Sequence, residues 1–356
     1  MTKTVLICGA GSTLNESRAT RVTDRPPLDR GFFKVAKRVA ASEFDAIASY
    51  LDESYSIDPT SREFDSLEQM MAILYSDVHN PAIRGASSIV AFRALLKLIN
   101  SRIAETTNSI RPTKYSALYR ILRNLLLDGV SPSDISIITF NYDLIVEKVI
   151  FKLQQSSSVA HLRPLSIFPA CYRLGRFRNS NAPRSSAQFP RSGAALSGIE
   201  ILKLHGSLNW FSKHRSKAPS PTALLNQNRE LLVTPRRNVM VDMTARGRSR
   251  MMYTFPIVVP PVIHKASILH TSLSPVWECA LTALESAKNV IVLGYSCPMA
   301  DQESSNLISR GLRGSVNLSK LSIIDPATAS FQRFADLTSA SRIYYSSSSN
   351  AYLSGT

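Results

Sequence analysis

The chain has 356 residues, of which 44% are hydrophobic and 19% charged, which is ordinary for a globular protein with a sizeable core. This composition excludes a wholly disordered chain, and the length allows one large α/β domain or two average ones. The formal net charge of +16 favours polyanions such as nucleic acid, acidic protein or phosphate-bearing ligands, and says nothing about the fold.

The cysteines and the apolar runs limit the environment of the protein. The four cysteines, Cys8, Cys171, Cys279 and Cys297, form no Cys-x-x-Cys pair, so neither a zinc site nor a disulfide framework is indicated. The first apolar run, residues 5–8, is too short for a signal peptide, and no later run is long enough to span a bilayer. We therefore expect a cytoplasmic protein without a metal or a membrane partner.

The first part of the chain alternates between strand and helix patterns. Residues 4–8 are a β-branched and apolar run that predicts a buried strand, and a glycine-rich loop follows, after which no helix is expected to start at once. From about 34 to 130 the apolar residues recur at helical spacing, which predicts a helical insertion. Residues 135–140 predict a second strand, with a helix over 143–152 behind it.

Residues 156–255 form a basic, loop-rich insertion. Ser, Arg, Pro and Asn dominate residues 156–198, and strand patterns return only at 199–204 and 255–259. Residues 163–250 hold 16 Lys and Arg against 3 Asp and Glu, so the positive charge is concentrated there. Either these cations contact nucleic acid or an acidic partner, or they form a solvated, mobile loop. The arginines in question are Arg173, Arg176, Arg178, Arg236, Arg237, Arg246, Arg248 and Arg250.

The last third of the chain has a regular rhythm. Helix patterns at 277–284, 301–312 and 329–337 alternate with strand patterns at 290–293 and 321–324, and the serine run 346–349 predicts a flexible tail. Alternation of this kind is typical of a parallel sheet covered by helices. We predict a single α/β domain over residues 1–356, a Rossmann-like doubly wound parallel sheet that carries the helical and the basic insertions.

Candidate ligand-binding residues follow three of the predicted strands. The loop of Gly9, Ala10, Gly11, Ser12 and Thr13 would let a pyrophosphate approach the backbone, although a plain tight turn also explains it. A second set of candidates follows two later strands. In this set the Asp325 carboxylate could accept hydrogen bonds from ribose hydroxyls, although turns or helix caps would also explain these residues. This set is Gly294, Ser296 and Asp325.

Candidate catalytic residues follow two further strands. Asn141 and Asp143 lie where the 135–140 strand ends, although either side chain could instead cap the next helix. His205 lies beside Gly206 after the 199–204 strand, where an imidazole could exchange protons at neutral pH or be purely structural. The order of these motifs along the chain is more informative than any one of them.

In that order, the motifs resemble those of the sirtuin-like NAD-hydrolase domains of bacterial anti-phage defence proteins. The resemblance extends from the first strand to about Asp325. Its motifs are Gly9–Ser12, Pro26–Phe33, Phe140–Asp143, Lys203–Trp210 and Gly294–Ser296. The chain departs from protein-deacylating sirtuins in two ways, because it has no cysteine spacing for a zinc module and carries Pro27–Arg30 where they have Asp-Phe-Arg.

The resemblance implies that the glycine loop holds the phosphates of NAD⁺ and that His205 and Asn141 form the catalytic core, with Asp143 at the nicotinamide carboxamide. Ser296 and Asp325 would lie toward the adenosine half. The implied activity is regulated hydrolysis of NAD⁺ to nicotinamide and ADP-ribose in antiviral defence. The implied partners are further copies of the chain and a helicase or nucleic-acid-guided subunit.

Two alternatives remain open at this point. The domain could bind NAD⁺, ADP-ribose or nucleic acid without turnover, or it could transfer a group, as a zinc-free deacylase or an ADP-ribosyltransferase. Nicotinamide release would separate the first from a hydrolase, and modified protein would reveal the second. The role of the helical insertion is also open, since it could cover the ligand or form an assembly surface.

Overall fold

A computed structural model of the chain describes fifteen stretches of it, which carry the elements and the site given below. They are residues 3–19, 31–64, 66–80, 82–83, 85–166, 168, 170–174, 176–179, 186–188, 198–212, 231–233, 256–259, 273–298, 301–338 and 340–354. Residues 26–30 of the Pro26–Phe33 motif lie outside this part, as do five of the arginines predicted to bind nucleic acid. These five are Arg236, Arg237, Arg246, Arg248 and Arg250.

Six parallel strands form the main sheet, in the order β11-β10-β9-β1-β2-β5. At its centre, Leu6 of β1 lies opposite Ile137 of β2 on one side and Ile291 of β9 on the other. The strands are β1 (Thr4–Cys8), β2 (Ile135–Thr139), β5 (Glu200–Lys203), β9 (Asn289–Leu293), β10 (Lys320–Ile324) and β11 (Ile343–Ser346).

The strand order identifies the fold class. Counted along the chain, the six strands are arranged 3-2-1-4-5-6, the order of the doubly wound Rossmann fold, and the order reverses between β1 and β9. Ligands of open parallel sheets bind at the carboxyl ends of the strands at such a reversal. The predicted Rossmann-like, doubly wound α/β sheet is therefore confirmed.

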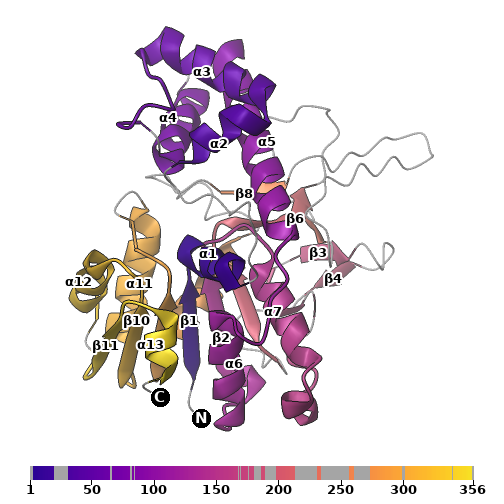
Figure 1. The fold of residues 1–356 in the computed structure, drawn as a ribbon, viewed down its shortest axis with the longest axis vertical. Coiled ribbons are helices and arrows are strands. Elements are labelled where there is room, and N and C mark those ends of the chain that lie inside the picture. Colours follow the sequence, from indigo (N-terminus) through magenta and orange to yellow (C-terminus); the bar gives the residue numbers. More distant parts are fainter. Residues whose placement is uncertain are drawn as a thin grey trace.

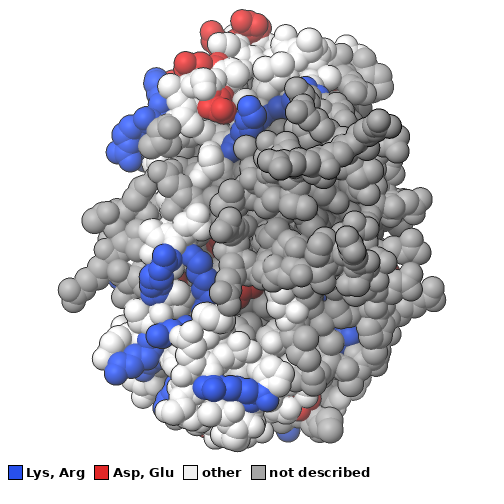
Figure 2. Space-filling model, turned by 90° about the vertical axis from the view of Figure 1, so that its right-hand side faces the viewer, with Lys and Arg blue, Asp and Glu red and all other residues white. Residues whose placement is uncertain are grey.

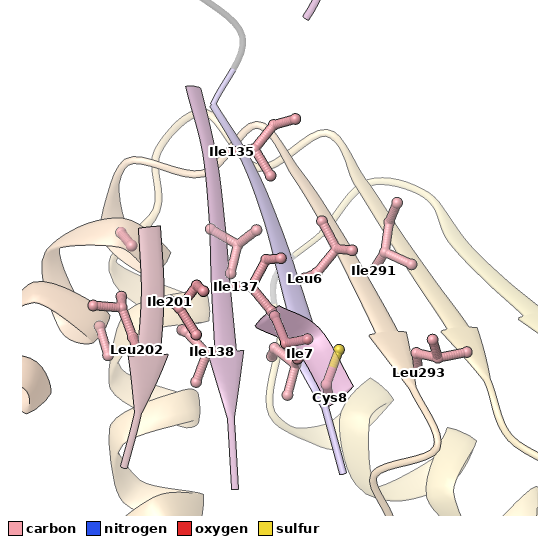
Figure 3. Close-up of a cluster of buried hydrophobic side chains, with 14 of the residues drawn as sticks. Leu6, Ile7, Cys8, Ile135, Ile137, Ile138, Ile201, Leu202, Ile291 and Leu293 are labelled. Carbon is pink, nitrogen blue, oxygen red and sulfur yellow. The ribbon is translucent and has the colours of Figure 1, made fainter. Parts of the chain in front are cut away.

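The core of the sheet is built from β-branched and other aliphatic side chains. Strands β1 and β2 are buried along their whole length, and every residue of β1 is 0% exposed. Figure 3 shows the apolar side chains of neighbouring strands side by side across the sheet. Runs that are apolar on both faces are expected where helices cover both sides of a parallel sheet.

Helices cover the two faces of the main sheet (Figure 1). The apolar stripe of α6 packs in the same core as β1 and β2, so this last helix of the predicted 34–130 layer belongs to the sheet. The covering helices are α1 (Ala10–Ala19), α6 (Ala117–Leu127), α7 (Ile145–Gln154), α10 (Ser274–Glu285), α11 (Gln302–Gly314), α12 (Thr328–Asp336) and α13 (Ser349–Ser354).

The remaining four helices of the insertion form a separate helical unit above the sheet, at the top of Figure 1. This unit has its own hydrophobic core, and Asp77 accepts hydrogen bonds from the hydroxyls of Tyr50 (2.8 Å) and Tyr55 (2.6 Å) within it. The helical insertion is thus confirmed. Its helices are α2 (Phe32–Val39), α3 (Ala41–Tyr55), α4 (Leu67–His79) and α5 (Ala86–Asn108).

A second sheet forms in and just after the basic insertion, and the sequence patterns predicted only its last strand, at 255–259. Its five strands are ordered β4-β3-β7-β6-β8, and they are three to seven residues long. Such short strands, paired with partners far along the chain, leave little periodic signal. The strands are β3 (Arg176–Asn179), β4 (Ser186–Gln188), β6 (Gly206–Ser212), β7 (Leu231–Val233) and β8 (Pro256–Val258). Short 3₁₀ helices occur at Pro132–Asp134, Ser157–Leu162 and Ala170–Tyr172.

The prediction that no helix follows the glycine loop at once is wrong, because α1 begins at Ala10. Glycine, serine and asparagine are poor helix formers, which hid the helix in the sequence. Tertiary contacts hold it instead. The Ser12 hydroxyl donates to the Gly9 carbonyl, and the buried Glu16 side chain accepts the N–H of Leu118 at the start of α6.

The predicted flexible tail is also wrong. Residues 343–346 form the edge strand β11, which pairs in parallel with β10, and α13 follows. The Asn15 amide donates to the Ser349 hydroxyl at 3.1 Å, so the C-terminal segment contacts α1. A serine-rich composition masked a strand that a neighbouring strand stabilises.

Candidate functional site

A cavity of about 1180 Å³ lies at the carboxyl ends of the main-sheet strands. Residues that follow all six strands contribute to its wall, and its size is slightly above the roughly 300–1,000 Å³ of typical small-molecule sites. The wall includes, from β1 to β11, Gly9, Asn141, His205, Gly294, Asp325 and Ser347. The structure thus brings predicted site residues of five separate motifs into one cavity, whereas the predicted Ser12 is buried and does not line it.

The glycine loop packs directly against the loop after β9. The Gly11 N–H donates to the Gly294 carbonyl at 2.9 Å, and the Ser12 N–H donates to the Gly9 carbonyl at 2.9 Å. A Cβ atom on Gly9 or Gly11 would lie within 2.8 Å of the Gly294–Tyr295 backbone, and Gly294 has a left-handed φ of +58°. These three glycines are therefore required by the contact between two loops, besides any approach of a ligand.

Asn141 ties the loop after β2 to the glycine loop. Its side-chain amide nitrogen donates to the Gly9 carbonyl at 2.8 Å and lies 3.0 Å from the Thr13 hydroxyl. Asp143 accepts the Thr13 hydroxyl at 2.6 Å with one oxygen and the Ile145 N–H, at the start of α7, at 2.9 Å with the other. The capping alternative thus holds for Asp143, while Asn141 caps no helix in the described structure.

The Lys203–Trp210 motif also contacts the loop after β2 that carries Asn141. The Lys203 side chain is fully buried, and its ammonium donates to the Asp143 carbonyl and lies 3.3 Å from a Glu147 carboxylate oxygen. The Leu208 N–H donates to the Tyr142 carbonyl at 2.9 Å. An ammonium in a low-dielectric interior requires such partners, so the lysine of the motif positions the Asn141 loop.

Asn209 and Ser207 extend this buried network. The Ser207 hydroxyl donates to the Asn209 side-chain oxygen at 2.6 Å, and the Asn209 amide donates to the Tyr172 hydroxyl at 3.1 Å. Tyr172 in turn donates to Glu147 at 2.7 Å. The motif is thus a set of buried hydrogen bonds around the site, and only His205 in it lines the cavity.

His205 occupies a two-residue turn between the main sheet and the second sheet. Strand β5 ends at Lys203 and β6 begins at Gly206, whose φ is +84°. The Trp277 indole N–H donates to the Leu204 carbonyl at 3.1 Å, and the Val259 N–H donates to the His205 carbonyl at 2.8 Å. Helix α10 on one side and the residue after β8 on the other therefore fix the backbone that carries the imidazole.

A carboxylate that was not singled out from the sequence contacts His205. The Nε2 atom lies 2.8 Å from Asp301 Oδ2, and the His205 and Asp301 side chains are 5% and 1% exposed. Asp301 is the N-cap of α11 and accepts the Ser304 N–H at 3.3 Å. Asp301-x-x-Ser304 has the spacing of a capping residue and its N3 partner, a signal visible in the sequence. Its proximity to His205 could not be seen there, because the two lie on different elements.

Aromatic rings surround the imidazole. Phe140 packs edge-to-face on His205 with centroids 5.3 Å apart and stacks on Tyr295 at 4.0 Å, and the Tyr142 ring lies 6.2 Å from His205. Burial, then the charges of nearby carboxylates, raise the pKa of the Tyr142 and Tyr295 hydroxyls well above the usual value. The two carboxylates that act on both tyrosines are Glu68 and Asp301, so acidic groups face this end of the cavity.

The residues predicted for the adenosine half lie on the opposite side of the reversal point. Ser296 is exposed, and its carbonyl accepts a hydrogen bond from Arg333 at 2.9 Å. Asp325 follows β10, is 7% exposed and accepts the Ala327 N–H at 2.8 Å in the turn before α12. Both line the same cavity, and their part in binding a ribose stays a prediction.

The helical unit supplies one wall of the cavity. Residues of three of its helices reach the lining, with one carboxylate and one hydroxyl among apolar groups. These are Phe32, Leu67, Glu68, Met71, Ile103 and Thr107. Of the two roles left open for the insertion, covering the ligand site is therefore the one that the structure supports.

The arginines of the basic insertion require a correction. Arg173 is buried and forms an ion pair with Glu200, which also accepts the Ser136 hydroxyl, so Arg173 does not belong to a nucleic-acid-binding surface. Arg176 and Arg178 lie in β3. Figure 2 shows Lys and Arg side chains on both the upper and the lower parts of the visible face, with acidic groups mainly at the top.

The described residues contain neither a metal cluster nor a membrane-spanning helix. Among them, no three His, Cys, Asp or Glu side chains are grouped as they would be around a metal ion. None of their helices is both long and apolar enough to cross a bilayer. All four cysteines are buried free thiols, and burial raises the pKa of Cys8 and Cys171 to about 12.

Fold and site together define a Rossmann-like α/β protein with a large ligand cavity at the point where the strand order reverses. No family model and no curated protein matches the chain. Among solved structures, one described as "The Structural basis of Sirtuin Substrate Affinity" matches with 12% identity and a TM-score of 0.37, over 96% of this chain and 88% of that one. A likeness at this level carries no argument about function, so function is argued from the site.

Proposed function

We propose that this protein is an NAD⁺ hydrolase that cleaves the bond between nicotinamide and ribose. One observation carries the proposal: Asn141 and His205 follow the adjacent strands β2 and β5 and line one cavity together with the glycine loop after β1. A dinucleotide laid across the strand-order reversal would reach both groups. The anti-phage role rests on the sequence resemblance alone.

The cavity suits a ligand with two phosphates. The first turn of α1 faces it through Ala10, Gly11 and Thr13, and a helix N-terminus attracts negative charge. Arg18 of α1 and Arg120 of α6 also line the cavity. The pyrophosphate would lie at the start of α1, the adenosine toward Asp325 and Ser296, and the nicotinamide riboside toward His205.

The chemistry requires few groups. As the bond between ribose C1′ and the nicotinamide nitrogen breaks, its electron pair neutralises the pyridinium, and positive charge develops on the ribose. Water adds its oxygen to C1′ and gives one proton to a base, which returns it to solvent, so the products are nicotinamide, ADP-ribose and H⁺. His205 is the base, and Asn141 orients the water or the ribose. Asp143 accepts a hydrogen bond from the carboxamide of the nicotinamide.

Regulation follows from the proposed reaction. An unrestrained NAD⁺ hydrolase would deplete the cell that makes it, so its activity must depend on assembly or on a second protein. We propose, from the resemblance, a homo-oligomer with a helicase or nucleic-acid-guided partner. The basic insertion, apart from Arg173, is the segment proposed to contact nucleic acid.

The deciding experiment measures nicotinamide and ADP-ribose release from NAD⁺ by the purified protein, with and without added nucleic acid. His205→Ala and Asn141→Ala should each reduce release by at least 100-fold, on the order of the contribution of general acid–base catalysis. Arg123→Ala, on α6 and outside the cavity lining, serves as the control. Full turnover by either folded site variant would contradict the assignment.

The same assay tests the alternatives. NAD⁺ binding in a calorimeter without nicotinamide release under any condition would select a binding module. Nicotinamide release that is matched by ADP-ribosylated or deacylated protein, instead of free ADP-ribose, would select group transfer.

A further inference from the structure

We infer that Asp301 is a positioning residue that fixes which nitrogen of His205 carries the proton. The inference rests on the proposed function, in which His205 is the base. It assigns Nε2 as the protonated nitrogen and directs Nδ1 to the reaction. The observations behind it are the 2.8 Å contact between His205 Nε2 and Asp301 Oδ2 and the way in which the fold holds the carboxylate.

The contact itself indicates where the proton lies. An ionised carboxylate only accepts hydrogen bonds, and a neutral imidazole has one donor and one acceptor nitrogen. Two acceptors 2.8 Å apart would repel, so the nitrogen that faces Asp301 is the donor. The neutral His205 ring then presents Nδ1 as its acceptor, which is the property that a general base needs.

Two further hydrogen bonds, both from Ser304, hold the Asp301 carboxylate. Asp301 caps α11, and its Oδ1 accepts the Ser304 N–H at 3.3 Å. Its Oδ2 also accepts the Ser304 hydroxyl, at 2.6 Å. Asp301 and Ser304 are both 0% exposed. The side chain therefore stays in place whether or not a substrate is bound, and His205 is held against a rigid group.

This arrangement gives Asp301 two effects on a base. It selects one tautomer, and its negative charge stabilises the imidazolium that forms when His205 takes a proton. The other described carboxylates near this end of the cavity are Glu68 of α4 and Asp143 after β2. Asp143 is engaged by Thr13 and Ile145, and Asp301 is the carboxylate in contact with Nε2, so Asp301 is the group assigned to tautomer selection.

Asp301→Asn tests the assignment without removing the cap, because asparagine is an equally good N-cap residue. The asparagine side chain can turn its NH₂ toward Nε2, which then becomes an acceptor and moves the ring proton to Nδ1. Nitrogen NMR of histidine-labelled protein, at a pH where His205 is neutral, distinguishes the two tautomers. The chain has six histidines, and His205→Gln identifies the signal of His205.

The expected spectrum shows Nε2 protonated in the wild type and Nδ1 protonated, or a mixture, in Asp301→Asn. The expected kinetics are a kcat lowered on the order of 10²- to 10⁴-fold with an unchanged KM for NAD⁺, since the variant alters the base and leaves the ligand contacts intact. Asp77→Asn is the matched control, a buried carboxylate in the helical unit, and should change neither readout.

The outcomes separate the inference from the proposed function. An Nδ1-protonated wild type, or the same tautomer in both proteins, would overturn the inference, as would an unchanged kcat in Asp301→Asn. If the tautomer changes but no form of the protein releases nicotinamide, the proposed hydrolase fails while the assigned contact stands. If the wild type hydrolyses NAD⁺ and Asp301→Asn does so equally well, the hydrolase stands and the inference fails.

Discussion

At the residue scale, the glycines of the site show that the role of a motif can depend on contact with a residue far along the chain. Gly9 and Gly11 suggest a phosphate loop when seen alone, and the structure shows them in contact with Gly294, far along the chain. The two loops share backbone hydrogen bonds, so any side chain at the contact would push them apart. The floor of the cavity depends on that contact.

Gly294→Ala should therefore be strongly destabilising. A Cβ there would lie 2.4 Å from the Gly11 carbonyl carbon, at a φ of +58°. Left-handed strain costs roughly 1–2 kcal/mol and overpacking typically adds roughly 1–3 kcal/mol, so we expect a loss of about 3 kcal/mol in urea unfolding. Gly129→Ala isolates the strain, because Gly129 has a φ of +86° with nothing within 4 Å. Equal losses in the two variants would show that the loops can separate at little cost.

Glu16 predicts a pH dependence of stability. Burial raises its pKa from 4.5 to about 7 in the folded protein, against the opposing hydrogen bonds from Ser116 and Leu118. Between about pH 4.5 and 7 the folded state thus holds a proton that the unfolded state has lost, so the free energy of unfolding falls as pH rises through this window. The total is about 3 kcal/mol.

Glu16→Gln keeps an oxygen that can accept the Leu118 N–H and removes the buried charge. We expect the variant to equal the wild type near pH 4.5 and to exceed it in stability above pH 7, in urea unfolding measured from pH 4.5 to 8. Glu53→Gln makes the same chemical change at an exposed position of α3 and serves as the control. A wild type that gains stability across the window, relative to Glu16→Gln, would refute the assignment.

The sequence predicted the site residues unevenly for a physical reason. His205 and Asn141 follow strands in motifs that are local in the chain, and both line the cavity. Lys203 was part of the Lys203–Trp210 motif without a role of its own, and Asp301 was only the first residue of a predicted helix, because what each does depends on a partner elsewhere. Contacts between distant segments leave no periodic trace.

At the element scale, α1 provides two sources of positive potential at the cavity, its N-terminus and Arg18. Its N-terminal turn faces the cavity, and Arg18 lies near its C-terminal end, where a cation is favourable for the helix. Arg120 of the adjacent helix α6 lines the same cavity, and its guanidinium lies 3.4 Å from the Asn350 oxygen of α13. Three helices from distant parts of the sequence thus meet at one cationic end of the cavity.

Arg18→Ala and Arg120→Ala should each raise the KM for NAD⁺ without lowering kcat, because a phosphate contact away from the reacting bond contributes equally to substrate and transition state. Loss of one charge-assisted hydrogen bond corresponds to roughly 1.5–3 kcal/mol, or about 10- to 150-fold in KM. Arg123→Ala is the matched control on α6. A fall in kcat with an unchanged KM would place these arginines in a different role.

At the scale of the whole molecule, the alternation of strands and helices was sufficient to predict the parallel sheet, because five of its six strands carried their own apolar pattern, while α1 and the edge strand β11 did not. The second sheet was not predicted as a sheet, because only β8 had a strand pattern, at 255–259, and its strands pair across gaps such as that between β3 and β7. The helical unit was predicted as helices, but its place over the cavity depends on tertiary contacts.

The turn that carries His205 joins the two sheets, and this has a consequence for the smallest functional form of the protein. The position of the imidazole depends on both sheets, because β5, paired with β2, precedes the turn, and β6, paired with β8, follows it. A version cut down to the main sheet would lose the β6–β8 pairing that holds one side of this turn, because the second sheet is inserted in the chain between β5 and β9. Any trimmed or transplanted version must therefore keep the second sheet, although none of its strands belongs to the Rossmann core.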